Sequence, residues 1–301
     1  MKSRLSLPLR VHSWGGLGSQ LHTWFLVEEL KEKYPRRKIL WVHHSGGVTL
    51  REAELLDWSS ADETIFTDDF IQSSKTPGPL QESPRPRFSP RSVGRRLLVQ
   101  LAQRLGCVSR CNTNLEWISV KPWCLEIRGH YTSRQIKVEF AYQLSRLAVA
   151  SGYRPLLHSD DWDHGGADVA IHWRYGDLAD EKPDGVIPAE QVILTVFQTL
   201  GIDRVGQVCT LYSDSPDQAT GRFKDAFPSH VSLDVVEADP WTSLCGLVNA
   251  RSFIGSRSKL SIWAAAFRVM FDYPGLTMMP VETEAALLAL LPGARQKIAY
   301  Y

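Results

Sequence analysis

Three clusters of polar and charged residues each follow an apolar segment in the C-terminal half of the chain: "HWRYGD" at 172–177, "YSDSPD" at 212–217 and "GSRSKLS" at 255–261. The apolar segments before them are short and rich in β-branched residues, which is typical of strands buried in a parallel sheet. Ligands of open parallel sheets bind at the carboxyl ends of the strands. The three clusters are therefore expected to meet at one edge of a sheet.

The residue types in these clusters suit a nucleoside diphosphate. Arg174 offers phosphate oxygens a planar, permanently charged donor fork. Ser256, Ser258 and Ser261 stand where a helix is expected to start, and the N–H groups of a helix N-terminus bind anions. Asp214 could accept hydrogen bonds from a nucleobase or a ribose. Each also has a structural interpretation: a surface ion pair for the arginine, a helix cap for Ser258 and a turn for Asp214.

The elements that must position these residues alternate regularly in the C-terminal half. Predicted strands lie at 167–173, 207–212, 231–236 and 252–255, and predicted helices at 188–200, after Pro216, from Asp239-Pro240, and at 259–270. The N-terminal half predicts strands at 9–13, 38–44, 63–67 and 123–127, and helices after the glycine turn "WGGLGSQ" up to Tyr34-Pro35, at 92–105 and at 133–150. Such alternation specifies a parallel sheet flanked by helices. The expected fold is α/β, with two facing Rossmann-like domains.

The expected domains are residues 1–160 and 161–301, with a proline- and arginine-rich excursion at 72–91 in the first. A chain of 301 residues with a formal net charge of +1 gives no reason to expect a nucleic-acid partner. Its five cysteines lack the spacing of a disulfide framework or a zinc site. Neither a membrane-spanning segment nor a signal peptide is expected, which favours a cytoplasmic protein.

A basic amphipathic segment adds membrane contact to the expected cytoplasmic location. In "RSVGRRLLVQLAQRLG", residues 91–106, arginines alternate with leucines at helical spacing. A helix of this kind can lie on an anionic membrane, or it can be a domain-surface helix with solvated arginines. The sequence thus predicts a cytoplasmic protein with possible peripheral contact at the inner face of the membrane.

Four motifs of the chain, in the same order, resemble those of the inverting fucosyltransferases that carry an H-x-R-x-G-D-type motif, above all the bacterial α-1,2-fucosyltransferases. They are "GGLGSQ" at 15–20, "HWRYGD" at 172–177, "LYSD" at 211–214 and "GSRSKLSIWA" at 255–264, with a weaker match in "GHYTSRQI" at 129–136. Four residues depart from the family pattern: Ser19, Tyr175, Lys259 and Leu260. Tyr175 replaces an arginine, and Lys259 is the candidate to restore its charge.

The resemblance implies a GT-B fold, with an acceptor bound by the N-terminal domain and a GDP-sugar by the C-terminal domain. It implies fucose as the first donor sugar, an oligosaccharide or lipid-linked glycan as acceptor, and no cofactor and no metal ion. Another nucleotide sugar remains the alternative donor. The resemblance also implies that the matched positions bind the nucleotide sugar: Gly16, Gly18, Gln20, His172, Arg174, Asp214, Ser256, Ser258, Lys259 and Ser261.

Departure of GDP from C1 of a sugar places negative charge on the β-phosphate, which Arg174 and the helix N-terminus at Ser258 would stabilise. The group that deprotonates the acceptor hydroxyl has candidates on both sides of the expected cleft. His22 follows the glycine turn by one helical turn, and Glu181 follows the strand end at 173. Asp177 is assigned a structural role, holding the turn of its motif.

Two rival hypotheses come from other segments. "HSDDWDH" at 158–164 contains a D-x-D with flanking histidines that could bind a divalent metal, although a solvated loop is the favoured interpretation. The glycine turn at 15–20 lacks the third glycine and the acidic residue of a dinucleotide fingerprint. A non-catalytic protein that binds nucleotides or carbohydrates is the remaining alternative to an enzyme.

Overall fold

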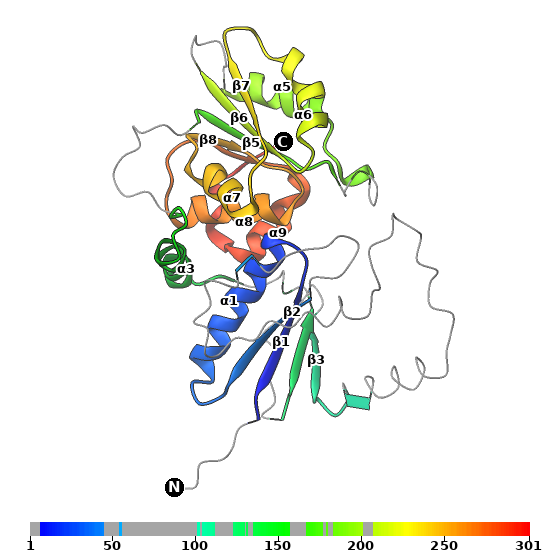
Figure 1. The fold of residues 1–301 in the computed structure, drawn as a ribbon, viewed down its shortest axis with the longest axis vertical. Coiled ribbons are helices and arrows are strands. Elements are labelled where there is room, and N and C mark those ends of the chain that lie inside the picture. Colours follow the sequence, from blue (N-terminus) through cyan, green and yellow to red (C-terminus); the bar gives the residue numbers. More distant parts are fainter. Residues whose placement is uncertain are drawn as a thin grey trace, which may run out of the picture. The chain divides into compact units, whose positions relative to one another are not determined.

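A computed structural model describes residues 7–44, 54–55, 101–102, 104–111, 123–129, 131, 135–156, 167–176, 179, 183–200 and 207–301. The chain divides into two compact units, unit 1 from Met1 to Arg134 and unit 2 from Gln135 to Tyr301 (Figure 1). Each is built on a parallel sheet, so the expected α/β class with two Rossmann-like sheets is confirmed. The division falls earlier than the predicted one at 160/161, because helix α3 (Val138–Ala150) packs on unit 2.

Unit 1 contains a four-stranded sheet of order β2-β1-β4-β3 with all neighbours parallel. Its described elements are β1 (Leu9–Trp14), α1 (Leu17–Lys33), β2 (Ile39–His44), β3 (Val108–Cys111) and β4 (Glu126–Gly129). The turn from β1 into α1 uses Gly15 at φ +88°, a left-handed conformation that glycine adopts without strain. The helix ends at Tyr34, since Pro35 cannot continue it.

Helix α1 is buried on every side over the run from Gln20 to Val27. The sequence predicts one apolar face, but polar residues of this run are also covered. The face of the sheet away from α1 is polar, because alternate residues of β1 and β4 place charged and aromatic side chains there.

Unit 2 contains a six-stranded parallel sheet of order β10-β9-β8-β5-β6-β7. Its strands are β5 (Val169–Trp173), β6 (Val208–Ser213), β7 (Ser232–Val236), β8 (Ser252–Ile254), β9 (Thr277–Met279) and β10 (Ala299–Tyr300). Its other helices are α5 (Ala189–Leu200), α6 (Pro216–Phe223), α7 (Pro240–Asn249), α8 (Lys259–Met270) and α9 (Glu284–Leu290), with short 3-10 turns at Pro183–Gly185, Lys224–Ala226, Val281–Thr283 and Pro292–Gln296.

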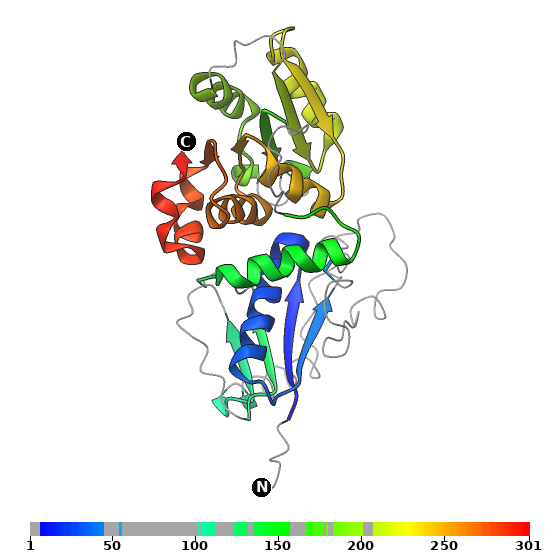
Figure 2. The same cartoon turned by 90° about the vertical axis from the view of Figure 1, so that its left-hand side faces the viewer.

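This strand order, numbered from β5, is the 3-2-1-4-5-6 order of the Rossmann fold. The chain reverses direction across the sheet between β5 and β8, which are neighbours. The α5–α6 pair packs together, and α8 packs with α7, α9 and α3 (Figures 1 and 2). A doubly wound sheet of this order binds ligands outside the carboxyl ends of the two central strands. In this chain those are β5 and β8.

A buried arginine links helices α7 and α8 to strands β8 and β9. Arg268 of α8 is 1% exposed, and its guanidinium donates to the carbonyls of Val248 at 2.7 Å and Ala250 at 2.5 Å. Its Nε donates to Thr277 Oγ1 at 2.8 Å. One side chain therefore joins the end of α7, the start of β8 and the start of β9 to α8. Among the described residues, no helix is long and apolar enough to cross a bilayer.

Candidate functional site

The carboxyl ends of β5 and β8 are joined by a network of hydroxyls around one imidazole. His172 Nδ1 lies 2.6 Å from Ser261 Oγ and 3.2 Å from Ser258 Oγ, and the Ser256 N–H donates to Ser261 Oγ at 2.9 Å. Ser258 is the N-cap of α8, and its Oγ accepts from the Ser261 N–H at 3.0 Å. All four side chains are buried. The network fixes the first turn of α8 against the end of β5.

Burial, and next the charge of Arg174, lower the pKa of His172 to about 3. The imidazole is therefore neutral at physiological pH and acts as a hydrogen-bonding group of the scaffold. The three serine hydroxyls serve the same network. The groups suited to an anion at this edge are then the backbone N–H groups that any first helical turn presents, together with the cations beside them.

Two cations stand at this helix start. Lys259 is the first residue of α8, and burial, followed by the Arg174 charge, lowers its pKa to about 8. The charge of Arg174 lowers the pKa of both Lys259 and His172. Two basic residues together with a helix N-terminus suit a ligand with concentrated negative charge, such as a diphosphate.

The loop after β5 is clamped by Asp214, the residue after β6. Its Oδ1 accepts from the Tyr175 N–H at 2.9 Å, and its Oδ2 lies 3.8 Å from Arg174 Nε. A Cβ on Gly176 would stand 2.7 Å from Asp214 Oδ2, so a larger residue at this position would displace the aspartate side chain. The H-x-R-x-G part of the motif thus has a physical explanation. Its histidine holds the first turn of α8, its arginine lies beside Asp214, and its glycine leaves room for the aspartate side chain.

The structure also accounts for tyrosine at 175, where the resembling family has arginine. The Tyr175 ring stacks on Trp173 with centroids 4.9 Å apart, and the Arg222 guanidinium lies 5.3 Å from the tyrosine ring centroid. Residue 175 therefore belongs to an aromatic stack. Compensation of the missing arginine charge by Lys259 stays a prediction.

Sequence reasoning missed the residues that hold the loop between β8 and α8. The Tyr301 hydroxyl donates to the Gly255 carbonyl at 2.6 Å. Arg257 donates to the Asp184 carbonyl at 2.8 Å and forms an ion pair with Glu282. No local sequence pattern joins these positions. Tyr301 and Glu282 follow β10 and β9, which come next to β8 only through strand pairing.

The glycine motif belongs to unit 1. Gly16 is the N-cap of α1, and Gly18 lies buried in its first turn. Gln20 is fully buried; its side chain donates to the Gly15 carbonyl at 3.2 Å and accepts from the Leu55 N–H at 3.4 Å. His22 is 4% exposed. Gln20 therefore braces the turn, and nucleotide binding by this motif stays a prediction, as does a base role for His22.

The remaining predicted site residues, Asp177 and Glu181, lie outside the described residues, as does the 158–164 segment with its D-x-D. A second cluster of titratable side chains, which sequence reasoning also missed, occupies the polar face of the unit 1 sheet around His12, His44 and Glu126. Among the described residues, no group of His, Cys, Asp and Glu side chains has an arrangement suited to a metal ion.

No protein-family model matches the chain, and no curated protein matches it by sequence. Among solved structures, E. coli heptosyltransferase WaaC with ADP shares 14% identity at a TM-score of 0.47, over 98% of this chain and 92% of that chain. E. coli ADP-heptose LPS heptosyltransferase II shares 12% at 0.46, over 98% and 90%. POFUT1 in complex with GDP shares 9% at 0.40, over 91% and 98%. Similarities at this level assign no function to the chain.

Proposed function

We propose that the protein is an inverting, metal-independent glycosyltransferase that moves a sugar from a nucleoside diphosphate to a hydroxyl of a glycan. One observation carries the proposal. Arg174, Lys259 and the first turn of α8 converge at the carboxyl ends of β5 and β8, the ligand edge of a Rossmann-order sheet. The motif resemblance makes GDP-fucose the first donor to test, and an oligosaccharide or lipid-linked glycan the acceptor class.

The main chemical requirement at this edge is stabilisation of the negative charge on the leaving group. As the bond between C1 and the phosphate oxygen breaks, the electron pair leaves with the nucleoside diphosphate. Arg174 and Lys259 stabilise the growing charge on the β-phosphate, and the N–H groups of the α8 start add to this effect. Preorganised donors are effective here because the His172 network holds the helix start in place before the reaction begins.

The test is a thermal-shift panel of GDP, ADP, UDP and their sugar conjugates, followed by turnover of any stabilising donor with and without excess EDTA. A ligand at 100 times its dissociation constant stabilises the fold by about 2.7 kcal/mol. We expect GDP compounds to give the largest shift and EDTA to leave turnover unchanged. Activity that required added Mn²⁺ or Mg²⁺ would overturn the mechanism. Tight binding of GDP without turnover of any donor would indicate a binding protein.

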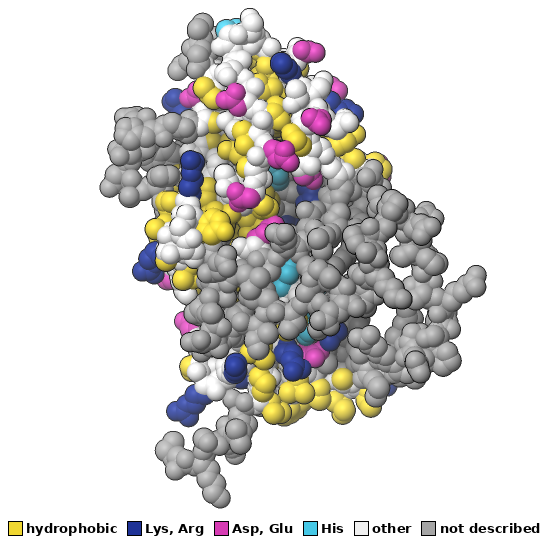
Figure 3. Space-filling model, in the orientation of Figure 1, with side chains coloured by type: hydrophobic (Ala, Val, Ile, Leu, Met, Phe, Trp, Pro, Cys, Tyr) yellow, Lys and Arg dark blue, Asp and Glu magenta, His cyan; other side chains and the backbone are white. Residues whose placement is uncertain are grey.

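A lipid-linked acceptor would place the protein at the inner face of a membrane, and one surface of unit 1 supports this part of the proposal. Leu101, Leu105, Trp123 and Leu125 are exposed near the amino edge of the sheet, and Arg104 is exposed among them. Hydrophobic and basic side chains lie together at that end of the unit (Figure 3). Co-sedimentation with anionic liposomes that is lost on Trp123→Ser is the expected result; equal binding to neutral liposomes would contradict it.

A further inference from the structure

The loop between β8 and α8, residues 255–258, begins with a glycine that is bound through both of its backbone polar groups. The Gly255 N–H donates to the Met278 carbonyl at 2.9 Å, and the Gly255 carbonyl accepts from the Tyr301 hydroxyl at 2.6 Å. The loop then runs into Ser258, the N-cap of α8. The backbone that leads into this helix is therefore fixed at the point where it leaves the sheet.

Tyr301 is itself held in place. Its N–H donates to the Met279 carbonyl at 3.0 Å, and its carbonyl accepts from the Val281 N–H at 3.1 Å. Its ring packs against the buried core of unit 2, and burial raises the pKa of the hydroxyl above its usual value. The hydroxyl therefore keeps its proton near neutral pH, and it is oriented as a donor to the loop.

Arg257, in the middle of the same loop, joins it to two further segments. Its guanidinium donates to the Asp184 carbonyl at 2.8 Å and forms an ion pair with Glu282. Asp184 lies in the short turn Pro183–Gly185, which follows β5 in the chain, and Glu282 lies in the turn Val281–Thr283, which follows β9. A guanidinium reaches two acceptors in fixed directions, whereas an ammonium is a compact point charge. Arg257 therefore links the segments that follow β5, β8 and β9.

These contacts bear on the proposed donor site because the loop leads into its helix. The N–H groups at the start of α8 and the Lys259 ammonium stabilise charge on a phosphate best when the backbone that carries them is in place beforehand. A misplacement of about 1 Å can cost about 10²-fold in rate. We propose that Tyr301 and Arg257 are positioning residues for the β-phosphate of the donor, and that they act through the 255–258 loop without touching the ligand. This inference rests on the proposed function.

The test compares the affinity of the full chain for GDP with its affinity for GMP, which lacks the β-phosphate, by titration calorimetry. Tyr301→Phe keeps the ring and removes only the hydroxyl that donates to Gly255. We expect the Kd of GDP to rise about five- to tenfold, as on loss of one hydrogen bond. The Kd of GMP should stay within about twofold of wild type, because the displaced N–H groups serve the β-phosphate.

Tyr300→Phe is the matched control at the neighbouring position. The Tyr300 hydroxyl is buried and has no hydrogen-bond partner among the described residues, so its removal releases no group of the loop. Both GDP and GMP should bind this variant as they bind wild type.

A second pair of variants tests Arg257 without changing the charge of the site. Arg257→Lys keeps a cation near Glu282 but loses the fixed fork, so GDP should lose about threefold or more in affinity relative to GMP. Arg295→Lys is its control, because Arg295 forms a similar ion pair with Glu284, at 3.3 Å, away from the loop. This control should bind both nucleotides as wild type does.

GDP affinity that is unchanged in Tyr301→Phe or in Arg257→Lys would exclude that residue from the role. An equal loss of GDP and GMP affinity would overturn the inference, because a general loosening of unit 2 would give that result. These measurements need no turnover. A wild type that binds GDP but transfers no sugar would overturn the proposed enzyme activity alone, whereas a wild type that binds no nucleoside diphosphate would overturn both.

Discussion

Arg174 is the residue from which the largest loss of transfer activity is expected on the donor side. Its Nε lies 3.8 Å from Asp214 Oδ2, at the edge where the diphosphate is proposed to bind. Arg174→Ala should lower kcat/KM. The expected loss of transition-state stabilisation is about 2–4 kcal/mol, as on removal of one charge-stabilising donor in other enzymes. Steady-state kinetics with the best donor would measure it.

The control for Arg174 is Arg222→Ala, which removes an exposed guanidinium from the outer side of the Tyr175 stack and leaves the proposed anion site intact. Its thermal stability and kinetics should stay close to wild type. Near-normal turnover by Arg174→Ala would contradict the assignment of the arginine to the leaving group.

Lys259 gives the donor site a pH dependence of definite sign. Its pKa in the free protein is lowered to about 8, and a bound diphosphate favours the charged form and raises that pKa again. GDP binding therefore takes up a proton above pH 8, and its affinity should fall as the pH rises, by up to about tenfold per unit. Titration calorimetry between pH 7 and pH 9 measures this. Lys259→Arg, which stays charged, should flatten the profile; an unaltered slope would exclude the lysine as its source.

At the scale of elements, Arg268 decides whether the helices and strands behind the donor edge stay together. It is buried and donates to carbonyls at the end of α7 and the start of β8, where no other described side chain provides the same positive charge. Arg268→Met fills much of the volume but leaves these carbonyls unsatisfied. We expect a loss of about 3 kcal/mol in the free energy of unfolding, measured by urea denaturation.

Arg251→Met serves as the comparison for Arg268, because Arg251 is exposed and contributes its carbonyl, not its side chain, to the same cluster. Its unfolding midpoint should hardly move. Equal stability of the two variants would mean that α7, β8 and α8 are held by apolar packing alone.

Several elements were predictable because their signals are local. The Asp239-Pro240 pair starts α7 as expected, with Asp239 Oδ1 accepting from the Trp241 and Thr242 N–H groups. Helix α8 spans the predicted residues 259–270. Strands β9 and β10 and helix α9 were missed. Strands of three and two residues carry no alternation pattern and are defined only by pairing, β9 with β8 and β10 with β9.

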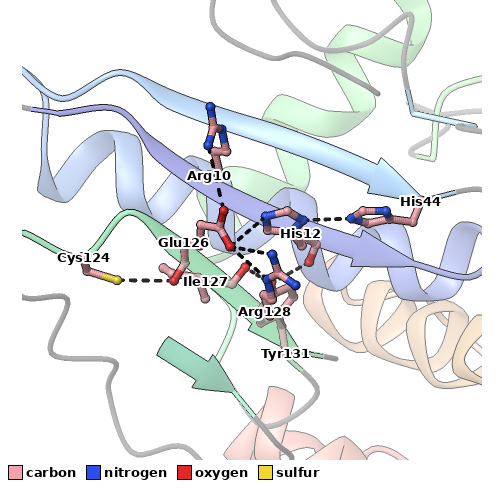
Figure 4. Close-up of polar contacts among 8 residues, drawn as sticks. All are labelled: Arg10, His12, His44, Cys124, Glu126, Ile127, Arg128 and Tyr131. Carbon is pink, nitrogen blue, oxygen red and sulfur yellow. Dashed lines mark hydrogen bonds and ion pairs between the residues drawn. The ribbon is translucent and has the colours of Figure 1, made fainter. Parts of the chain in front are cut away.

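How far the candidate sites could be predicted depends on whether the sequence alone shows which residues meet in the fold. The donor edge could be anticipated because its residues follow strands, and parallel strands bring their ends together. The hydroxyl network could not, since Ser256 and Ser261 look like phosphate ligands in sequence and become buried partners of His172 only in the fold. His12, His44 and Glu126 are far apart in the chain, and only the register of β1, β2 and β4 makes them neighbours (Figure 4).

At the scale of the whole molecule, two of the described histidines have a lowered pKa: His12 in unit 1, to about 4, and His172 in unit 2, to about 3. In the unfolded chain both titrate near 6.5. Between these values the unfolded state binds more protons than the folded state, so the free energy of unfolding decreases as the pH falls below about 6.5. Each histidine contributes a slope of up to about 1.4 kcal/mol per pH unit.

Acid should therefore lower the stability of each unit. His172→Asn keeps a polar atom at the Nδ1 position and removes the titrating group, so it should reduce the pH dependence of unfolding by about one proton between pH 6.5 and pH 4.5. His230→Asn, at an exposed position of unit 2, should leave that dependence unchanged. Urea denaturation at each pH gives the slopes. If the free energy of unfolding of His172→Asn had the same pH dependence as that of wild type, the imidazole would be protonated in the folded state. The assignment of a neutral His172 that holds the start of α8 would then be wrong.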